Sequence, residues 1–351
     1  MDIIDNVMEE YDELRERYTR LEEIASEIIE QAAGDEKNGV MQVTHRIKTR
    51  ESVRGKLHKK PEKYTSLEKM TDILGYRIVC YFSDQVDEIA AKLSAALDVD
   101  RDLSTDKRAA IAPDAFGYLS LHYICRLPGD KGFPEDLSHL PFEIQIRSSL
   151  QHTWAEIEHD LGYKTKFGVP RDVRREFSRV AGLLELADEA FVHIRSRISE
   201  YQKELYEQIS NDQAESYHLD LVSLKLYLQH SHLMTGFMDE IRQITGASII
   251  DTDPESALEK LDYLGIKTLG DMNELVETER QHALQMIRDL LGDGDIEELI
   301  STVGIYYLCR SRLVYGDYDS KAIAGFLRLS DSNEENVRKQ TAYLLKKRAH
   351  S

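Results

Sequence analysis

Regular alternation of apolar and polar residues predicts β-strands in the first half of the chain. Between residues 142 and 147, Phe and Ile alternate with Glu143, Gln145 and Arg147. This period of two is typical of a strand with one buried face. The complete set of expected strands is residues 39–47, 76–82, 118–127 and 141–147.

Most of the segments around these strands have apolar residues at helical spacing, so we expect them to be helices. Apolar residues recur every three or four positions over residues 3–33, which predicts a long amphipathic helix ending at Gly34. The polar stretch at residues 98–113 is expected to be a loop over a site. Because strands alternate with helices, the pattern indicates an α/β domain. Shorter helices are expected at residues 52–60 and 85–97.

After Pro170 the pattern is helical as far as residue 351, with no convincing strand longer than residues 247–250. We therefore expect three parts: an N-terminal helix at residues 1–38, an α/β domain with a long trailing helix at 39–212, and an all-helical domain at 213–351. The helical domain could regulate the protein or form an oligomer. The trailing helix is expected at residues 171–210, and the helices of the helical domain at residues 219–244, 254–264, 268–291, 296–314, 320–329 and 334–348.

Composition and charge narrow the class of protein. The 351 residues are 41% hydrophobic and 31% charged, as in a globular protein, and no apolar run approaches transmembrane length. The net charge of −19 argues against broad binding to nucleic acid or membranes. The N-terminus is too acidic for a signal peptide, and the three cysteines form no CxxC pair. A cytoplasmic protein without structural zinc or disulfides is expected.

A basic stretch stands out against this acidic background. Residues 45–64 contain eight Lys and Arg but two Glu. The stretch could be a solvated helix face or a site for a polyanion such as a nucleoside triphosphate. Its cations are Arg46, Lys48, Arg50, Arg54, Lys56, Lys59, Lys60 and Lys63.

The strand at residues 141–147 also carries groups that suit a metal-bound polyphosphate. Its carboxylate could hold a hard cation, and its arginine could bind phosphate oxygens. The alternative is a strand with one solvated face. In the helix that follows, we expect Trp154 to pack in the core.

Four short blocks of sequence follow one another in an order that is typical of a known family. Together they resemble the synthetase domain of the RelA/SpoT alarmone synthetases, over roughly residues 40–200. The blocks are Arg46 to Lys56, Asp72 to Arg77, Gly117 to His122, and Glu143 to Arg147 followed by Trp154 to Lys164.

The resemblance implies a nucleotidyltransferase-like α/β (α+β) fold with a mixed β-sheet. It also implies a magnesium-dependent transfer of the β,γ-pyrophosphate of ATP to the 3′-hydroxyl of GTP or GDP, which makes (p)ppGpp. It implies that Asp72 and Glu143 are the catalytic carboxylates and hold Mg²⁺, since carboxylates and cations must converge on the developing charge. Glu143 is also a candidate base for the acceptor hydroxyl. The residues implied for ATP are Arg46, Lys48, Ser52, Lys56 and Arg77.

For the acceptor, the resemblance implies that the Tyr118 ring stacks on guanine, an interaction worth about 1–3 kcal/mol per base in nucleic-acid complexes. Glu158, His159 and Lys164 belong to the signature, without a role that we can assign. The other residues implied for the acceptor are Lys107, His122, Gln145 and Arg147.

The sequence departs from the family pattern at Asp114, which stands where a phosphate-binding lysine is often found, although Lys107 and Arg108 remain. A carboxylate there would repel the acceptor's 5′-phosphates. Some family members act as toxins that pyrophosphorylate the tRNA 3′ end, so GTP/GDP and tRNA both stay open as acceptors.

The segments on either side of the four blocks bear on further functions. About 40 residues precede the blocks, so no hydrolase domain and no alarmone hydrolase activity are expected. The helical domain that follows them could form a homo-oligomer, sense a ligand or act as a built-in inhibitor. A non-catalytic, nucleotide-binding regulator is the third functional hypothesis, and no membrane partner is expected.

Overall fold

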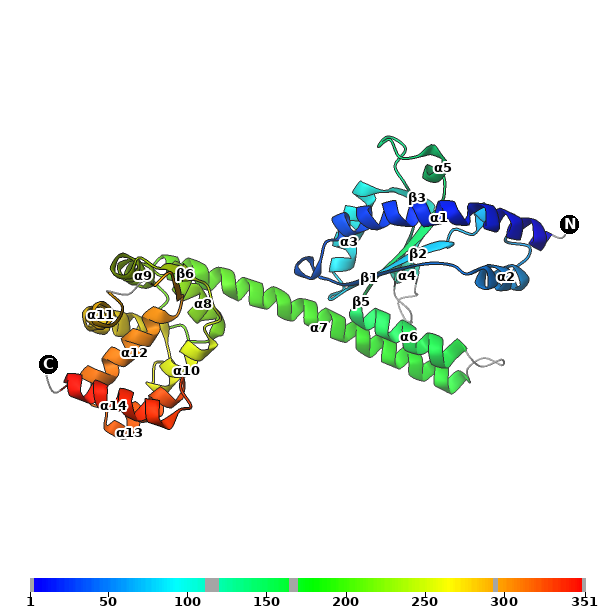
Figure 1. Ribbon diagram of the computed structural model, residues 1–351. Coiled ribbons are helices and arrows are strands. Elements are labelled where there is room, and N and C mark those ends of the chain that lie inside the picture. The colour runs from blue at the N-terminus through cyan, green and yellow to red at the C-terminus, as the bar shows by residue number, and fades with distance from the viewer. Residues whose placement is uncertain (1–2, 111–119, 164–169, 293–295, 349–351) are drawn as a thin grey trace. The chain divides into compact units, whose positions relative to one another are not determined.

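The structure is a computed structural model that describes residues 3–110, 120–163, 170–292 and 296–348 (Figure 1). The chain divides into two compact units, Met1–Arg195 and Ser196–Ser351. The domain boundaries expected at residues 38/39 and 212/213 stay predictions. Among the helices of the described residues, none combines the length and the apolar character needed to cross a membrane.

A five-stranded sheet forms the centre of the first unit. The strand order is β1-β2-β5-β4-β3. β2 and β5 run parallel, and the other neighbouring pairs are antiparallel. The expected mixed sheet is therefore confirmed. The strands are β1 (Val40–Ile47), β2 (Leu74–Cys80), β3 (Asp98–Asp106), β4 (Leu121–Arg126) and β5 (Phe142–Ser148).

One face of this sheet is covered by the N-terminal helix α1 (Ile3–Ala33), as expected from its apolar stripe (Figure 1). Leu21 and Ile29 of α1 are fully buried in the same cluster as Ile144 and Ile146 of β5. Burial of this apolar area is the main force that fixes α1 on the sheet. The other helices of the unit are α2 (Arg50–Lys59), α3 (Gln85–Ala96), α4 (Lys107–Ala110), α5 (Glu135–Ser138), α6 (Ser149–Tyr163) and the first part of α7 (Arg171–Ser210).

The expected loop at residues 98–113 is wrong for its first half. Residues 98–106 form the edge strand β3, which pairs with β4. An edge strand has a neighbour on one side and can carry polar residues on both faces. The segment DVDRDLSTD therefore lacks the alternation that marks a half-buried strand. Residues 111–119 lie outside the described residues.

Helices α6 and α7 pack through a small apolar cluster. The Trp154 ring meets Phe177 edge-on, with 6.5 Å between ring centroids, and its Nε1 donates to the Phe177 carbonyl. Trp154 is 8% exposed and lies beside Ala155 and Ala181, so the expected core role of Trp154 is confirmed.

The second unit is helical, as expected, with two differences. A two-stranded parallel pair joins β6 (Ser248–Ile250) to β7 (Glu298–Ile300). The single helix expected at residues 219–244 is two helices, because Ser231 adopts an extended backbone and its hydroxyl caps the second helix. The helices are α8 (Leu221–His230), α9 (His232–Thr245), α10 (Glu255–Tyr263), α11 (Leu269–Leu291), α12 (Val303–Tyr315), α13 (Ser320–Arg328) and α14 (Glu334–Arg348).

A buried carboxylate ties α7 to the end of β5 and gives a testable prediction. The Ser148 hydroxyl donates to Asp188, which is 4% exposed. Burial raises the pKa of Asp188, and the nearby Asp84 adds to the rise. The folded state thus holds this proton more tightly than the unfolded state, so stability falls as the pH rises from 3.8 through the raised pKa.

Asp188→Asn removes the buried charge and keeps an oxygen that can accept from Ser148. We expect the variant to unfold about 2 °C or more above the wild type at pH 7 and to lose this advantage near pH 4, measured by scanning calorimetry. Asp172→Asn, at an exposed position on the same helix, is the control. A variant that is less stable than the wild type at pH 7 would contradict this account of Asp188.

Candidate functional site

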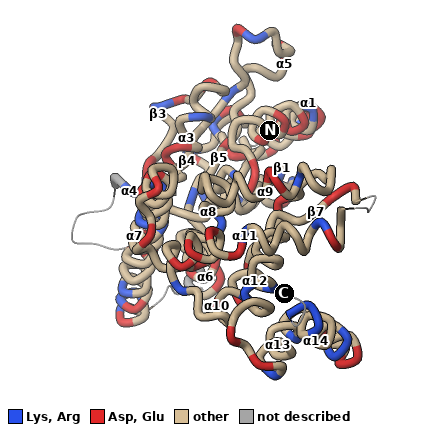
Figure 2. The backbone as a smooth tube through the Cα atoms, turned by 90° about the vertical axis from the view of Figure 1, so that its left-hand side faces the viewer, with Lys and Arg blue, Asp and Glu red and all other residues tan. Residues whose placement is uncertain are grey.

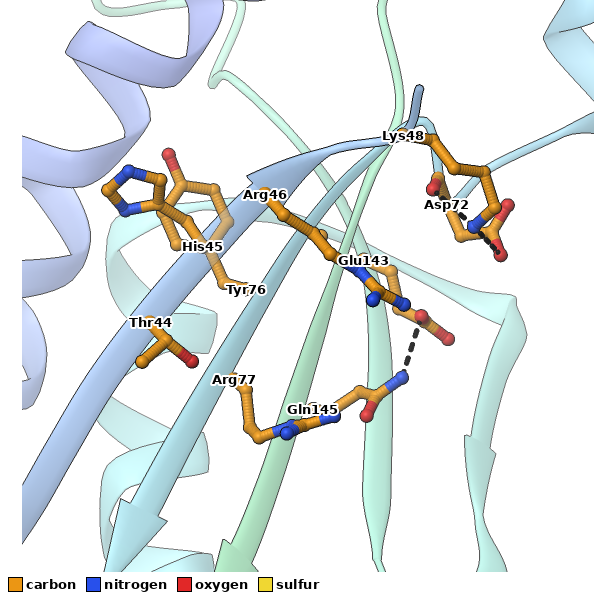
Figure 3. A pocket seen from close by; sticks show the side chains of 10 residues that line it. Thr44, His45, Arg46, Lys48, Asp72, Tyr76, Arg77, Glu143 and Gln145 are labelled. Carbon is orange, nitrogen blue, oxygen red and sulfur yellow. Dashed lines mark hydrogen bonds and ion pairs between the residues drawn. The ribbon is translucent and has the colours of Figure 1, made fainter. Parts of the chain in front are cut away.

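A polar cavity lies on the sheet face opposite α1. Alternation along neighbouring strands aims polar side chains such as Arg46, Arg77 and Glu143 at it (Figure 3). Ile144 and Ile146 of the same sheet are buried in the core cluster. The register places Gly75 beside both Arg46 and Glu143, and the missing side chain leaves open space between them. The cavity is lined by Thr44, His45, Arg46, Lys48, Asp72, Gly75, Tyr76, Arg77, Glu143 and Gln145.

Asp72, just before β2, is held by two lysines. Lys48 Nζ lies 2.9 Å and Lys56 Nζ 2.6 Å from the same oxygen, Oδ2. The other oxygen, Oδ1, is buried and has no partner within the described residues. Burial would raise the pKa of Asp72, but the two lysines outweigh it and hold the pKa below its ordinary value. Asp72 is therefore ionised at neutral pH and has one oxygen available.

Glu143, on β5, is also ionised. His122 Nδ1 lies 2.9 Å from Oε1, and Gln145 Nε2 donates to Oε2 at 2.9 Å. Burial would raise the pKa of Glu143, and Asp72 acts in the same direction, but the contacts with His122 and Gln145 prevail and lower it. The Asp72 and Glu143 carboxylates thus line one cavity and influence each other's charge.

The donor set fits a magnesium ion. Both carboxylates are ionised, and Asp72 Oδ1 is a buried oxygen that needs a partner. Among the described residues, no group of three or more His, Cys, Asp or Glu side chains could hold a metal by itself. Mg²⁺ commonly binds through one or two carboxylates and takes its other oxygens from water and phosphate. Two carboxylates, those of Asp72 and Glu143, are within the number that a protein commonly contributes to such a site.

A second cavity adjoins the first and shares Arg46, Arg77 and Gln145 with it. Its volume of about 520 Å³ lies within the range of small-molecule pockets. β4, β5 and α6 supply most of its other walls. The remaining lining residues are Lys107, His122, Arg147, Ala155, Glu156, Glu158 and His159.

The two cavities are joined by polar contacts along the sheet. Arg77, which borders both, forms a 2.8 Å ion pair with Glu156 of α6. Arg147 is 2% exposed, and its guanidinium donates to the side-chain amide oxygen Oε1 of Gln145. Since Gln145 donates in turn to Glu143, a continuous chain of hydrogen bonds orients these side chains on β5.

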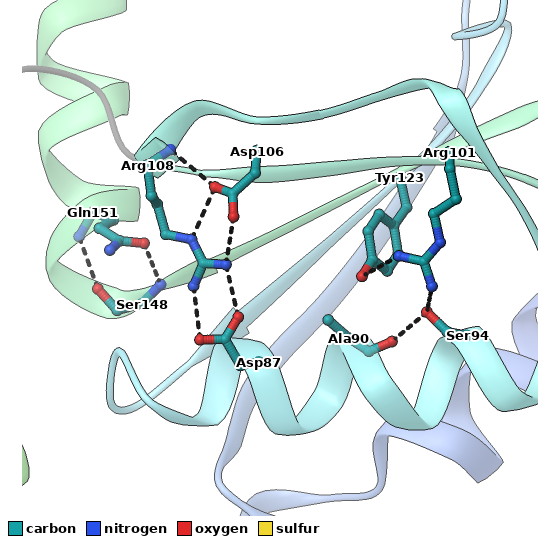
Figure 4. Close-up of polar contacts among 9 residues, drawn as sticks. All are labelled: Asp87, Ala90, Ser94, Arg101, Asp106, Arg108, Tyr123, Ser148 and Gln151. Carbon is teal, nitrogen blue, oxygen red and sulfur yellow. Dashed lines mark hydrogen bonds and ion pairs between the residues drawn. The ribbon is translucent and has the colours of Figure 1, made fainter. Parts of the chain in front are cut away.

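The two adjacent cations Lys107 and Arg108 have different environments. Arg108 is bound by Asp106 and by Asp87 of α3, and these carboxylates raise its pKa (Figure 4). Lys107 lines the second cavity instead. Burial lowers the pKa of Lys107, and Arg147 acts in the same direction. An anion in the cavity would oppose both effects, because a nearby negative charge favours the protonated amine.

The structure brings together most of the residues that the sequence suggested. The first cavity collects Arg46, Lys48, Asp72, Arg77, Glu143 and Gln145, and the second collects Lys107, His122 and Arg147. Lys56 reaches the first site through Asp72. Tyr118, Asp114 and Lys164 lie outside the described residues.

Ser52 lies outside both cavities, so its expected contact with ATP stays a prediction, and Glu156 has a contact that the sequence did not suggest. Ser52 is exposed in the first turn of α2, where its hydroxyl contacts the capping Thr49, and it lines neither cavity. Glu156 was given no role, yet it holds Arg77. The available signal for Glu156 was its position on the polar side of the helix after β5.

Comparison with known proteins identifies the family. The family described as "Region found in RelA / SpoT proteins" matches residues 45–167. The chain is 32% identical to GTP pyrophosphokinase YjbM of Bacillus subtilis (strain 168) over 169 residues, which cover 48% of this chain and 78% of that protein. It is 28% identical to GTP pyrophosphokinase YwaC of the same organism over 164 residues, covering 46% and 76%.

A solved structure, the small alarmone synthetase 1 from Bacillus subtilis, is 28% identical, with a TM-score of 0.43. The match covers 54% of this chain and 96% of that one. The extent and identity of the sequence match to YjbM place this chain in the RelA/SpoT family, which confirms the resemblance seen in the four blocks.

Proposed function

We propose that this protein is a GTP pyrophosphokinase that transfers the β,γ-pyrophosphate of ATP to the 3′-hydroxyl of GTP or GDP, making (p)ppGpp. Two relatives that carry the name GTP pyrophosphokinase support the activity. The observation that carries the proposal is structural: two ionised carboxylates line a cavity that shares three residues with a second cavity. A donor and an acceptor can therefore meet beside Gln145, which lines both cavities and donates to Glu143.

In this proposal the first cavity takes ATP. Arg46 and Arg77 project from adjacent strands, where they can neutralise phosphate oxygens or stack on adenine. Lys48 and Lys56 are positioned by Asp72 and add charge that suits a triphosphate. Bound to Asp72 and Glu143, Mg²⁺ would neutralise the charge that develops on the transferred group and the leaving AMP.

Glu143 would also orient the acceptor hydroxyl and take its proton. The lowered pKa makes Glu143 a weak base. A weak base is sufficient, because phosphoryl transfer passes through a loose transition state in which positioning and charge neutralisation dominate. His122, 2.9 Å from the carboxylate, fixes its orientation.

The second cavity would take the acceptor. Lys107, His122 and Arg147 supply the positive and hydrogen-bonding groups that the phosphates and ribose of a guanosine nucleotide require. Tyr118 remains the proposed platform for the base.

The acceptor assay tests this function. The protein is incubated with γ-labelled ATP and Mg²⁺, together with GTP, GDP or tRNA in separate reactions. We expect label in guanosine tetra- or pentaphosphate. Label on the tRNA 3′ end alone would show that tRNA, and not GTP or GDP, is the acceptor. Nucleotide binding without transfer to any acceptor would favour the regulator hypothesis.

Lys107→Ala tests whether the second cavity binds the acceptor and the first binds ATP, because the two substrates have separate KM values. We expect the KM for the guanosine nucleotide to rise about tenfold, the typical loss for one charge-assisted hydrogen bond, with little change in the KM for ATP. Steady-state rates with each substrate varied in turn measure both constants. Lys92→Ala, which removes a half-buried lysine paired with Glu88 outside both cavities, is the control. An equal rise in both KM values would contradict the assignment of Lys107 to the acceptor.

We also propose a reducing, cytoplasmic location. Cys80, Cys125 and Cys309 are all buried free thiols, which suits a compartment in which disulfides do not form.

A further inference from the structure

Helix α1 contacts the two chain segments that carry Lys48 and Asp72, in addition to covering the sheet. Acidic residues recur along α1 (Figure 2), and Tyr11 belongs to its buried face, with 1% of the residue exposed. The Tyr11 hydroxyl donates to the backbone carbonyl of Lys48 at 2.7 Å. Burial raises the pKa of Tyr11, so the phenol keeps its proton at neutral pH and remains a donor.

Lys48 lies in the short connection between β1 and α2, where hydrogen bonds hold it at three points. Its backbone N–H donates to the Ile73 carbonyl at 2.7 Å, and its carbonyl accepts from Tyr11. Its ammonium donates to the backbone carbonyl of Asp72 at 3.2 Å and to Oδ2 at 2.9 Å. Because a lysine side chain is a flexible stem, the place of the ammonium depends on where the backbone is fixed. Tyr11 supplies the contact that ties this backbone to α1.

The preceding residue of α1, Glu10, makes a similar contact with the segment before Asp72. Its Oε2 accepts from the backbone N–H of Leu67 at 2.8 Å. Leu67 begins the short 3₁₀ helix η2 (Leu67–Lys69), whose N-cap residue makes no side-chain capping bond, so Glu10 satisfies an amide at the start of η2. Two consecutive residues of one helix therefore hold both segments whose side chains form the ion pair of the first cavity.

The helix that carries these two contacts is itself fixed by the burial of its apolar stripe. A site for a triphosphate and a metal ion works only when its charged groups are held within about 0.5 Å of their productive positions by supporting contacts. The alternative is that the Tyr11 hydroxyl serves packing alone, by satisfying a buried carbonyl. The two possibilities differ in what happens to ATP binding when the hydroxyl is removed and the fold is kept.

We propose that Tyr11 is a positioning residue for ATP, which acts by fixing the backbone of Lys48 and so the place of its ammonium beside Asp72. This inference rests on the proposed function, in which these two side chains receive ATP and Mg²⁺. Tyr11 lines neither cavity. Its influence on ATP must therefore pass through Lys48.

Tyr11→Phe removes the hydroxyl and keeps the ring in the core. Calorimetric titration of the full chain with ATP and Mg²⁺, without acceptor, should show about fivefold weaker binding, the usual effect of one hydrogen bond. The KM for ATP should rise by a similar factor, while the KM for the guanosine nucleotide stays within about twofold of the wild type.

Tyr227→Phe is the matched control. It also removes a buried tyrosine hydroxyl, one that donates to Asn273 Oδ1 at 2.8 Å in the second unit. We expect it to lower the unfolding temperature, as Tyr11→Phe does, and to leave ATP binding and both KM values unchanged. Scanning calorimetry measures the unfolding temperature of each variant and shows that it folds.

A double-mutant cycle with Lys48→Ala separates positioning from packing. If Tyr11 acts through Lys48, Tyr11→Phe should change ATP binding by less than about twofold once Lys48 is replaced. Wild-type ATP affinity in Tyr11→Phe, or a loss of the same size with and without Lys48, would overturn the inference and leave the proposed function standing. A wild-type chain that binds no ATP would overturn the proposed function, and the inference with it.

Discussion

Glu143→Gln is expected to lower the rate of pyrophosphate transfer by about a thousandfold or more, while ATP still binds. Glutamine has nearly the same shape and keeps an oxygen for Gln145 Nε2 and His122. It lacks the negative charge that would hold the metal and accept the hydroxyl proton. The loss should therefore appear in kcat, with a smaller change in the KM for ATP.

Initial rates of guanosine product formation measure this effect, and fluorescence or calorimetric titration measures ATP binding. Glu88→Gln, at an exposed helix position paired with Lys92, should keep the wild-type rate. A Glu143→Gln enzyme within tenfold of the wild-type rate would show that this carboxylate carries neither the metal nor the proton.

Asp72→Asn is expected to weaken Mg²⁺ binding at this site, and so to lower turnover, while leaving ATP binding intact. The substitution removes the charge that Lys48 and Lys56 now share. Turnover with Mg²⁺ should fall about a hundredfold or more, and the Mg²⁺ concentration for half-maximal rate should rise. Metal-free ATP should bind at least as tightly as before, because both lysines become available to its phosphates.

The same substitution should affect stability. Since the folded-state pKa of Asp72 is lowered, its ion pairs stabilise the fold above the ordinary value of 3.8 and are lost as the pH falls through the lower folded value. Asp72→Asn should thus unfold at a lower temperature than the wild type at pH 7, with the difference shrinking in acid.

Asp12→Asn is the matched control for both effects. Asp12 is exposed and pairs with Arg50 outside both cavities, so its loss should change neither metal dependence nor turnover. If Asp72→Asn keeps the wild-type response to Mg²⁺, Asp72 is not a metal ligand.

The sequence predicted the central part of the fold because its strands there have one buried face. Alternation on β5 correctly placed Glu143, Gln145 and Arg147 on one side, and the apolar stripe of α1 correctly predicted its burial. The edge strand β3 was missed because one-sided pairing imposes no such alternation. The break at Ser231 was missed because a capping serine interrupts a helix without interrupting its apolar spacing.

Most residues that line the two cavities could be picked out from the sequence, but the contacts between them could not. The resemblance picked out Asp72 and Lys56, yet their contact joins a helix to the segment before β2 and depends on the tertiary fold. The ion pair of Arg77 with Glu156 likewise links a strand to a helix far along the chain. Arg108 pairs with Asp87 of α3, while its neighbour Lys107 lines the second cavity. This difference depends on where α3 packs, which no local sequence pattern reveals.

One measurement tests the central claim most directly: the fate of ATP labelled separately at its β- and γ-phosphates, with GTP as acceptor and Mg²⁺ present. The account predicts that both labels enter the guanosine product equally, that one AMP forms for each product molecule, and that Asp72→Asn and Glu143→Gln suppress all three signals. Transfer of the γ-label alone with release of ADP, or equal transfer by both variants, would contradict it.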